Sequence, residues 1–400
     1  MITDHNLSEL DSIISEFFDI ESKTYGGPKQ QFIARYFGNI KEKDTDKAFE
    51  KIHGARKPHE LVPLLRDEGE HLALFIMPEA EKKRSLNPRL NLILFILTLI
   101  SVLATGGLYG YEGELPGNAW QFIWELIKSG WPFAVSLLAI LSAHEFGHYF
   151  AGRKNDVQVT LPYFVPFPLS LFGTMGAFIN MRSLPKNKRA LFDLAVTGPL
   201  SGAIVSIVVL FIGLQLSNLN QLPFMASSDS ALQMEGNSLL YLLIKFLSFG
   251  RLLPKPPDLS GFHLFTYWLR YFFTGQPFPW GAQDVMLHPV AWAGWAGLLV
   301  TGLNLIPAGQ LDGGHIFYAL FGKKAAMRLF PFIIGALVLM SFFWSGWWLW
   351  AGLVFFLGRK HAEPMDQVTK LDGKRRWLGY LALVVFILTF VPVPMTLGGV

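Results

Sequence analysis

Long apolar runs restrict this chain to the few folds that are stable inside a lipid bilayer. Hydrophobic residues make up 51% of its 400 residues and charged residues only 16%, well below the roughly 25% of soluble domains. In hydrocarbon the chain must pair its own backbone amides, so a spanning segment is a helix of about 20 residues or a strand of a closed barrel. The runs have helical length, and we expect a polytopic α-helical protein embedded in the bilayer.

Seven segments have the composition of membrane spans. They cover residues 90–109, 131–152, 191–214, 290–306, 329–343, 347–357 and 377–391. The fifth and sixth are short and form either a tight pair or one long tilted helix. Four tryptophans lie around Ser345 and Gly346, which favours the pair, because tryptophan is enriched at bilayer interfaces.

Basic residues gather in alternate connections between these spans. They precede the first span and follow the second, fourth and sixth: Lys82, Lys83, Arg84, Arg89, Arg153, Lys154, Arg182, Lys186, Lys188, Arg189, Lys323, Lys324, Arg328, Arg359, Lys360, Lys374, Arg375 and Arg376. Basic loops are retained in the cytoplasm, so we interpret the clusters as topology determinants rather than lipid sensors and expect a cytoplasmic N-terminus. No signal or transit peptide is visible, and we expect the inner membrane of a prokaryotic cell.

The chain divides into three parts. Residues 1–86 have soluble character and predict a small cytoplasmic α+β domain, which residues 79–85 link to a membrane core over 87–320. Residues 321–400 add further spans. Within the first part we expect helices over 7–20 and 45–52, a strand over 32–38, and a hairpin formed by 60–66 and 71–77.

Residues 215–287 connect the third and fourth spans on the outer side. Within them, 239–249 and 262–273 are amphipathic and aromatic. Such helices lie flat on a membrane surface or dip into it, and the sequence favours neither arrangement. The net charge of +4 lies in the basic clusters, so nucleic acid is not an expected partner.

A His-Glu-Phe-Gly-His run occupies residues 144–148 inside the second span. A charged residue at the centre of a membrane helix costs roughly 2.5–3.5 kcal/mol on insertion scales, so such groups are kept when they pair or hold an ion. Residues four apart share one helix face, and His144 and His148 can therefore direct two imidazoles at one metal. Glu145 beside them can act on a metal-bound water.

Two imidazoles leave a catalytic zinc site one protein ligand short. The chain has no cysteine, which excludes thiolate ligands. Asp312 follows the fourth span on the same expected side as His148, in a stretch broken by Pro307 and several glycines. Irregular backbone at membrane depth is tolerated where it lines a site. Asn304, about two turns above, can hydrogen-bond a substrate or a developing oxyanion.

Residues 157–180 are too apolar for a cytoplasmic loop and too rich in proline for a helix. They read as two extended pieces around 166–172, which together form a re-entrant loop. An extended segment beside a peptidase centre can pair with substrate as an added strand. Phe172, Gly173 and Gly176 are the candidate substrate-groove residues in this segment, although glycines also form ordinary turns.

These motifs together resemble the site-2 protease family of intramembrane zinc metalloproteases, peptidase family M50. The resemblance rests on His144-Glu-Phe-Gly-His148, on Asn304-Leu-Ile-Pro followed by Leu-Asp312-Gly, and on Thr197-Gly-Pro-Leu-Ser-Gly202. Residues 172–177 and the N-terminal part are similar to its EGY-type branch. The resemblance implies that His144, His148 and Asp312 hold one Zn²⁺ and that Glu145 is the catalytic base.

We therefore expect an intramembrane zinc endopeptidase. Its expected substrates are single-span membrane proteins, unwound and cut near the cytoplasmic side. A zinc transporter or other metal-binding membrane protein is one alternative, although a transporter needs a path with several weak sites. A membrane scaffold that binds helices without cutting them is another. The sequence does not indicate an oligomeric state.

Overall fold

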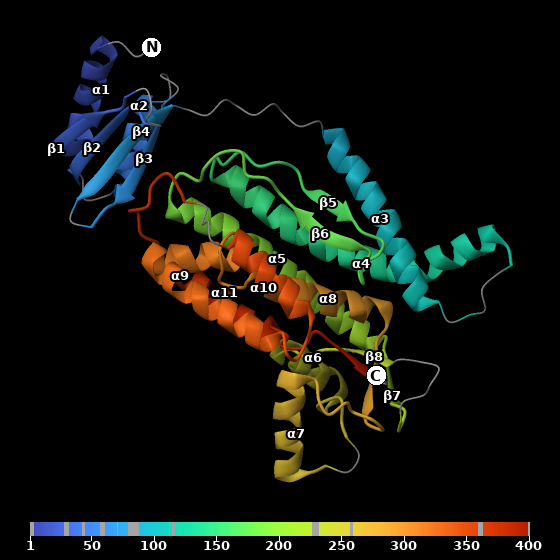
Figure 1. Ribbon diagram of the computed structural model, residues 1–400. Helices are drawn as coiled ribbons and strands as arrows, with labels where there is room; N and C mark the ends of the chain where they lie inside the picture. The colour runs from blue at the N-terminus through green and yellow to red at the C-terminus, as the bar shows by residue number, and fades with distance from the viewer. Residues whose placement is uncertain are drawn as a thin grey trace.

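The computed structural model describes residues 4–27, 32–41, 45–56, 61–69, 71–78, 88–111, 113, 117–225, 232–256, 259–358 and 363–398. The predicted linker 79–85 lies outside the described residues. A small α+β unit precedes a bundle of long helices, and two further helices and several short strands cover one end of that bundle (Figure 1).

The N-terminal unit is a four-stranded antiparallel sheet with two helices. Its strands are β1 (Phe18–Tyr25), β2 (Ala34–Ile40), β3 (Leu61–Asp67) and β4 (Leu72–Pro78), in the order β1-β2-β4-β3. The helices are α1 (Asp4–Phe17) and α2 (Thr45–Arg56). The predicted hairpin is confirmed, since β3 and β4 pair in antiparallel register.

The sequence prediction was wrong at the end of the first helix. We expected a helix over 7–20, but α1 stops at Phe17 and the chain continues as β1. Pairing with β2 joins Phe18 to Ile40 and Tyr25 to Ala34, and Phe18 is completely buried. Pairing with the next strand of the chain overrides local helix preference, which is a weak determinant.

Three helices among the described residues are long and apolar enough to cross a membrane. They are α3 (Pro88–Gly110), α4 (Ala119–Lys154) and α5 (Lys188–Gln215). The other predicted spans correspond to α8 (Pro289–Asn304), α9 (Asp312–Met340), α10 (Gly346–Leu357) and α11 (Gly373–Thr389). The membrane-protein class is therefore supported, and the count of seven spans stays a prediction.

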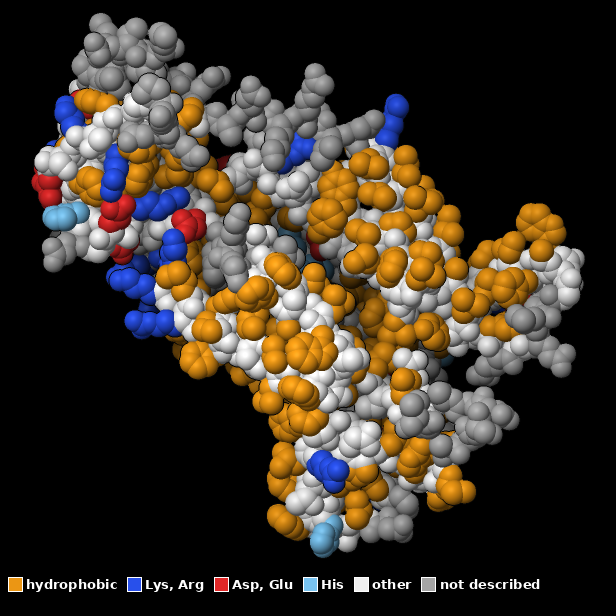
Figure 2. Space-filling model, in the orientation of Figure 1, with side chains coloured by type: hydrophobic (Ala, Val, Ile, Leu, Met, Phe, Trp, Pro, Cys, Tyr) orange, Lys and Arg blue, Asp and Glu red, His pale blue; other side chains and the backbone are white. Residues whose placement is uncertain are grey.

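The core of the bundle lies between α3, α4, α5 and α8. Leu137, Leu141, Leu210 and Trp295 are buried there in one hydrophobic cluster. Hydrophobic side chains cover most of the visible bundle surface, whereas charged side chains gather at the end that carries the N-terminal unit (Figure 2). An apolar outer surface of this extent suits a bilayer rather than water.

Two helices differ in extent from the predicted spans. Helix α4 starts at Ala119 rather than 131, because Asn118 caps it by accepting a hydrogen bond from the Trp120 amide. The helix contains Pro132 and is bent in Figure 1. Helix α9 starts at Asp312 and contains a non-helical residue, Gly322. The fifth and sixth spans form two separate helices, α9 and α10, as the tryptophan-rich join predicted.

The described residues of the outer segment form two helices and three short strands. Helices α6 (Leu239–Phe249) and α7 (Gly261–Thr274) match the two amphipathic stretches. The strands are β7 (Asn218–Gln221), β8 (Leu232–Glu235) and β9 (Gln283–Met286); β7 pairs with β9, and β8 pairs with β10 (Met395–Gly398) at the end of the chain. Lys245 of α6 is fully buried, with Nζ 3.6 Å from Asp284 and 3.9 Å from Glu235, which ties α6 to two of these strands.

Residues 363–369, which precede α11, run beside the N-terminal sheet. The Leu65 amide donates to the Met365 carbonyl at 2.8 Å, and the Gln367 amide donates to the Leu65 carbonyl at 3.1 Å. Met365 packs into the hydrophobic core of the N-terminal unit. The same segment also reaches the membrane core, because the Asp366 amide donates to the Lys186 carbonyl. The N-terminal unit is thus completed by a segment some 300 residues away.

Candidate metal centre

Two histidines of α4 face α5 near the end of the bundle that carries the N-terminal unit. His144 and His148 are each 5% exposed, and their Nε2 atoms lie 3.1 Å apart. The Nδ1 atom of His148 lies 2.7 Å from the Leu194 carbonyl oxygen of α5. A carbonyl only accepts hydrogen bonds, so Nδ1 carries the proton and Nε2 keeps a free lone pair for a ligand.

Glycines let α5 approach the two histidines closely. A Cβ atom on Gly198 would lie 2.1 Å from Nε2 of His148, and one on Gly202 would lie 3.2 Å from the His144 side chain. On α4, a Cβ on Gly147 would meet Ser201 Oγ at 2.4 Å. Gly198 and Gly202 therefore form a close-packing surface on α5, and this surface borders the histidine side chains.

Asp312 is the first residue of α9, and it lies beside His144 and His148 as the third member of the group. Its Oδ2 lies 3.4 Å from His144 Nε2 and 3.3 Å from His148 Nε2. The turn from α8 into α9 is tight: a Cβ on Gly313 would lie 2.0 Å from the Leu305 carbonyl oxygen, and Gly309 has a φ of +55°. The glycines that break the fourth span thus bring the Asp312 carboxylate over α4.

The geometry of the three groups fits a zinc ion. In a tetrahedral zinc site with bonds of about 2.0–2.1 Å, neighbouring ligand atoms lie about 3.3 Å apart. The three separations here are 3.1, 3.3 and 3.4 Å. Two imidazoles and one carboxylate are a donor set of catalytic zinc sites, which leave a fourth position for water or substrate. Within the described ranges, these three residues form the group with metal-ligand spacing.

Glu145 borders the same site from the neighbouring position on α4. Its side chain is 5% exposed, and Oε2 has no hydrogen-bond partner among the described residues. The carboxylate interacts with the backbone amide of Ile179, which directly follows the second strand of the extended segment. A buried carboxylate oxygen without a partner is costly, so this oxygen is available to a water or a substrate group in the site.

Asn304, the last residue of α8, also reaches the group. Its Nδ2 lies 3.5 Å from His144 Nε2, so the amide borders the three candidate ligands. His315 lies one turn after Asp312 and is buried, but it does not belong to the three-residue group.

The predicted extended segment forms an antiparallel hairpin. Strand β5 (Tyr163–Pro166) pairs with β6 (Thr174–Phe178). Strand β5 packs along α3, and the chain beyond β6 passes Glu145. Met175 of β6 is 73% exposed. The hairpin therefore lies along the bundle with one strand on the side of the site.

The three groove candidates in this hairpin have distinct surroundings. Phe172 packs against the rings of Trp292 and Trp295 in α8, at 6.1 and 6.4 Å between centroids. Gly173 has a φ of +73°, and its carbonyl accepts a 2.6 Å hydrogen bond from Ser101 of α3. Gly176 has a φ of +97° and open space where a Cβ would point. Phe172 and Gly173 thus anchor the turn to the bundle, and Gly176 faces free space.

Sequence reasoning missed two contacts that shape the site. The Leu194 carbonyl, which orients His148, belongs to an apolar helix, and the Ile179 amide, which meets Glu145, belongs to a hydrophobic loop. Both contacts are made by backbone groups, which every residue has, so the amino-acid sequence could not predict them. The four-residue spacing of Gly198 and Gly202 is a sequence clue that the third span packs closely against another helix.

Comparison with known proteins finds a peptidase family and several zinc metalloproteases similar to this chain. The family model of peptidase family M50 matches residues 132–343, more than half of the chain. The chain is 30% identical over 277 residues (69% of this chain, 44% of the relative) to "Probable zinc metalloprotease EGY2, chloroplastic" of Arabidopsis thaliana. It is 28% identical over 327 residues (76% and 52%) to "Probable zinc metalloprotease EGY1, chloroplastic" of the same plant. No solved structure matches.

The chain spans about half the length of the curated relatives that it matches. A further relative, "Probable zinc metalloprotease EGY3, chloroplastic" of Oryza sativa subsp. indica, is 28% identical over 268 residues, which are 65% of this chain and 42% of the relative. These names are chloroplastic, which gives no support to the prokaryotic inner membrane that the sequence led us to expect.

Proposed function

Because the chain belongs to peptidase family M50, the site-2 protease family, we propose that it is an intramembrane zinc endopeptidase. The observation that carries this proposal is the convergence of His144, His148 and Asp312 with a buried, unpartnered Glu145 oxygen beside them. Three ligands hold a metal and leave one position open, and a free carboxylate at that position provides an acid–base group.

One Zn²⁺ held by these three side chains would supply a Lewis acid that polarises a carbonyl oxygen and lowers the pKa of a water to about 7. Glu145 orients that water and accepts its proton through Oε2 as the water oxygen bonds to the scissile carbonyl carbon. The same carboxyl then donates a proton to the leaving amide nitrogen as the C–N bond breaks. The Asn304 amide is placed to donate a hydrogen bond to the negative charge that develops on the carbonyl oxygen.

The proposed substrates are single-span membrane proteins that become extended near the site. A helix hides its peptide groups in internal hydrogen bonds, so the cleaved segment must unwind before it reaches Glu145. Strand β6 supports this step, because it runs beside the site and exposes Met175. An unwound segment that pairs with β6 as an added strand would keep its amides bonded. The position of the site near the basic loops supports cleavage on that side of the membrane.

A single variant tests the mechanism. Glu145→Gln keeps the volume and a hydrogen-bonding group but removes the base, so zinc content should equal that of the parent. Cleavage of a labelled transmembrane peptide in liposomes should fall at least about 10²-fold, the low end for a positioned acid–base group. Zinc is measured by elemental analysis and cleavage by mass spectrometry of the products.

Two results would contradict the proposal. Cleavage by Glu145→Gln at near-parental rate would remove Glu145 from the chemistry. Zinc flux across vesicles carrying the parent protein, without peptide cleavage and without loss of flux in Glu145→Gln, would instead support the transporter. Chelation followed by zinc addition is the matching control, since it should abolish and restore cleavage in the parent and leave Glu145→Gln inactive throughout.

A further inference from the structure

The carbonyl that orients His148 belongs to Leu194, and a helix near the end of the chain holds the residue before it. Arg375 lies in the first turn of α11 and donates two hydrogen bonds to Asp193 of α5, from Nε to Oδ1 at 2.7 Å and from Nη2 to Oδ2 at 2.6 Å. The two side chains are only 32% and 22% exposed. Exposed ion pairs contribute little to stability, but a two-point pair between arginine and carboxylate fixes both distance and orientation.

The pair lies directly behind the metal centre. Asp193 and Leu194 are joined by one peptide bond, so a contact that fixes the Asp193 side chain also restricts the Leu194 carbonyl. The Thr197 hydroxyl lies 2.9 Å from the Asp193 carbonyl oxygen and 3.0 Å from the Gly147 carbonyl oxygen of α4. Gly147 directly precedes His148, so this part of α5 contacts α4 beside the ligand.

The turn of α5 that carries Leu194 is weakened by a proline. Pro199 lies inside α5 and has no N–H, so the hydrogen bond that residue 199 would donate to the Ala195 carbonyl cannot form. The first turns of α5 are therefore tied to the rest of the helix less strongly than in an uninterrupted helix. A contact from another helix can compensate for this loss, and Arg375 provides such a contact.

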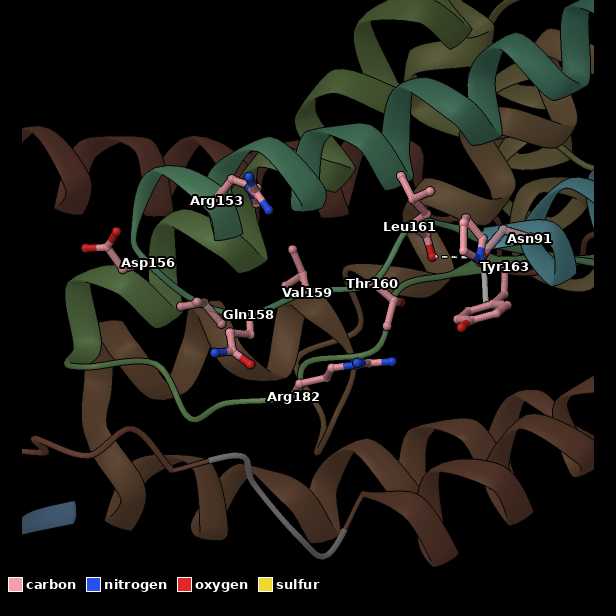
Figure 3. Close-up of a pocket in the computed structure, with 11 residues that line it drawn as sticks. Asn91, Arg153, Asp156, Gln158, Val159, Thr160, Leu161, Tyr163 and Arg182 are labelled. Atoms are coloured by element: carbon pink, nitrogen blue, oxygen red, sulfur yellow. Dashed lines mark hydrogen bonds between the residues drawn. The ribbon is translucent and has the colours of Figure 1, made fainter. Parts of the chain in front are cut away.

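The last turn of α4 is held from the opposite side. After Arg153 the chain turns and runs back beside α4 as an extended segment that contains Val159 (Figure 3). A Cβ on Gly152 would lie 2.8 Å from Cγ1 of Val159 and 3.1 Å from Cδ1 of Leu194. The end of α4 is thus enclosed between this segment and α5, and the placement of α5 sets the distance from the Leu194 carbonyl to His148.

Helix α11 also packs against the helix that carries Asp312. Ala382 of α11, Phe192 of α5 and Ile316 of α9 belong to one hydrophobic cluster, and Ile316 lies about one turn after Asp312. Helix α11 therefore contacts the two helices that place the Leu194 carbonyl and the third candidate ligand. It lies beyond residues 132–343, which the family model matches.

We propose that Arg375 is a positioning residue of the metal centre. Through its pair with Asp193 it fixes the second turn of α5, so that the Leu194 carbonyl keeps the His148 imidazole in the orientation that a metal requires. This role rests on the proposed zinc peptidase function and deepens it, because part of the metal affinity then depends on a helix outside the family match. The sequence assigns Arg375 to a basic cluster that orients the chain in the membrane, and the pair gives it a second role.

Metal affinity measures this role independently of cleavage. Zinc affinity of the full-length protein is measured by competition with a chromogenic chelator, and the Co²⁺-loaded protein by visible absorption, which reports ligand geometry. Arg375→Met should weaken zinc binding about tenfold, the low end for contacts behind a metal ligand, and should alter the Co²⁺ bands. Arg375→Lys keeps the charge but loses the planar fork, so it should recover only part of the affinity. Parental affinity and an unchanged Co²⁺ spectrum in Arg375→Met would overturn the proposal.

Asp372→Asn is the matched control. Asp372 caps α11 and is the other carboxylate that pairs with Arg375, and asparagine caps a helix as well as aspartate does. The variant leaves the pair with Asp193 intact, so zinc affinity and the Co²⁺ spectrum should stay close to those of the parent. A loss equal to that of Arg375→Met would assign the effect to the start of α11 and contradict the positioning role.

A double variant tests whether the two residues act as one unit. Asp193→Asn should weaken zinc binding as much as Arg375→Met, and the combined substitutions should add nothing to either loss, because each alone removes the same pair. Asp193→Asn also reports on this pair if Arg375→Met does not fold. Losses that multiply in the double variant would show that the two residues act separately, against the proposal. A parent protein that binds no zinc would instead remove the proposed function itself.

Discussion

The two histidines of α4 depend on residues that carry no functional group. Gly198 leaves room for the His148 ring, and the Leu194 carbonyl holds its Nδ1 proton. A metal ligand is oriented by such outer contacts, and their loss typically lowers metal affinity. The metal centre therefore requires close packing of α4 against α5 as much as it requires the histidines.

Gly198→Ala tests this dependence. The new methyl would stand 2.1 Å from His148 Nε2, so the ring must move away from the other two ligands. We expect zinc affinity to fall at least about tenfold, with cleavage lost in parallel. The control is Gly335→Ala in α9, where a Cβ meets open space; it should keep parental zinc and activity. Parental zinc binding in Gly198→Ala would mean that α4 and α5 are not packed as described.

At the scale of elements, the β5–β6 hairpin connects α3 with the metal centre. Its turn is fixed to the bundle by Phe172 and Gly173, and the chain just past β6 meets Glu145. A charged residue at Phe172 would therefore disturb packing as well as substrate contact. Met175 is the sharper test position, because it is exposed and its replacement leaves the packing intact.

Met175→Glu should reduce cleavage of a transmembrane peptide about tenfold or more, since a charge in the path of an apolar substrate segment carries a desolvation cost. Zinc content and the melting temperature should stay at parental values. Met175→Leu keeps the apolar surface and should cleave normally. Equal turnover in the Glu and Leu variants would exclude β6 from substrate handling.

The second element-scale feature is the strand-like segment 363–369 beside β3. Arg66 donates hydrogen bonds to the carbonyls of Pro364 and Met365, at 3.0 and 2.8 Å, and lies 3.7 Å from Glu363. Burial raises the pKa of Glu363, but the Lys323 hydrogen bond and the Lys323 and Arg66 charges outweigh it and lower the pKa overall. The ionised Glu363 carboxylate therefore contributes to folding stability at pH values above its ordinary pKa. This contribution is lost as the pH falls through the lowered pKa of the folded state.

Arg66→Met should release this segment from the N-terminal unit. We expect faster amide hydrogen exchange at Leu65 and Gln367, because their mutual backbone bonds lose the arginine that braces them. The control, Arg35→Met, removes an arginine whose partner Glu68 lies within the unit itself, and exchange at residues 363–369 should not change. Unchanged exchange in Arg66→Met would show that the backbone pairing holds the segment without the arginine.

At the scale of the whole molecule, the basic connections meet at one end. The Met365 and Asp366 amides donate to the carbonyls of Pro185 and Lys186, and Lys323 pairs with Glu363 at 2.7 Å. The N-terminal unit docks on the same segment. The basic connections are far apart in the sequence, but they lie together at one end of the bundle. This arrangement is expected if they all face the same side of the membrane.

This arrangement predicts the membrane topology. Tags at residue 1 and at Lys186 should be accessible from the same side of the membrane, and a tag at the exposed Phe224 should be accessible from the other. Protease protection of sealed vesicles measures each position. The three inserted tags serve as controls for one another, provided that each tagged protein retains zinc. Accessibility of Phe224 from the same side as Lys186 would contradict the predicted order of spans.

The sequence by itself determined the class of the protein and most of its candidate centre. Apolar runs require helices in a bilayer, since backbone amides have no other partner there. The i, i+4 spacing of His144 and His148 places two imidazoles on one face through helix geometry alone. Asp312 could be predicted as the third ligand, because a glycine-rich break after the fourth span sets its side of the membrane.

Only the tertiary structure decided how these parts meet. Strand β1 replaces the predicted end of a helix because β2 lies beside it, and residues 363–369 complete a sheet that the sequence confined to the first 86 residues. The approach of Ile179 to Glu145 and of Leu194 to His148 involves backbone atoms. Such contacts depend on the relative placement of distant segments, which side-chain patterns within one segment do not encode.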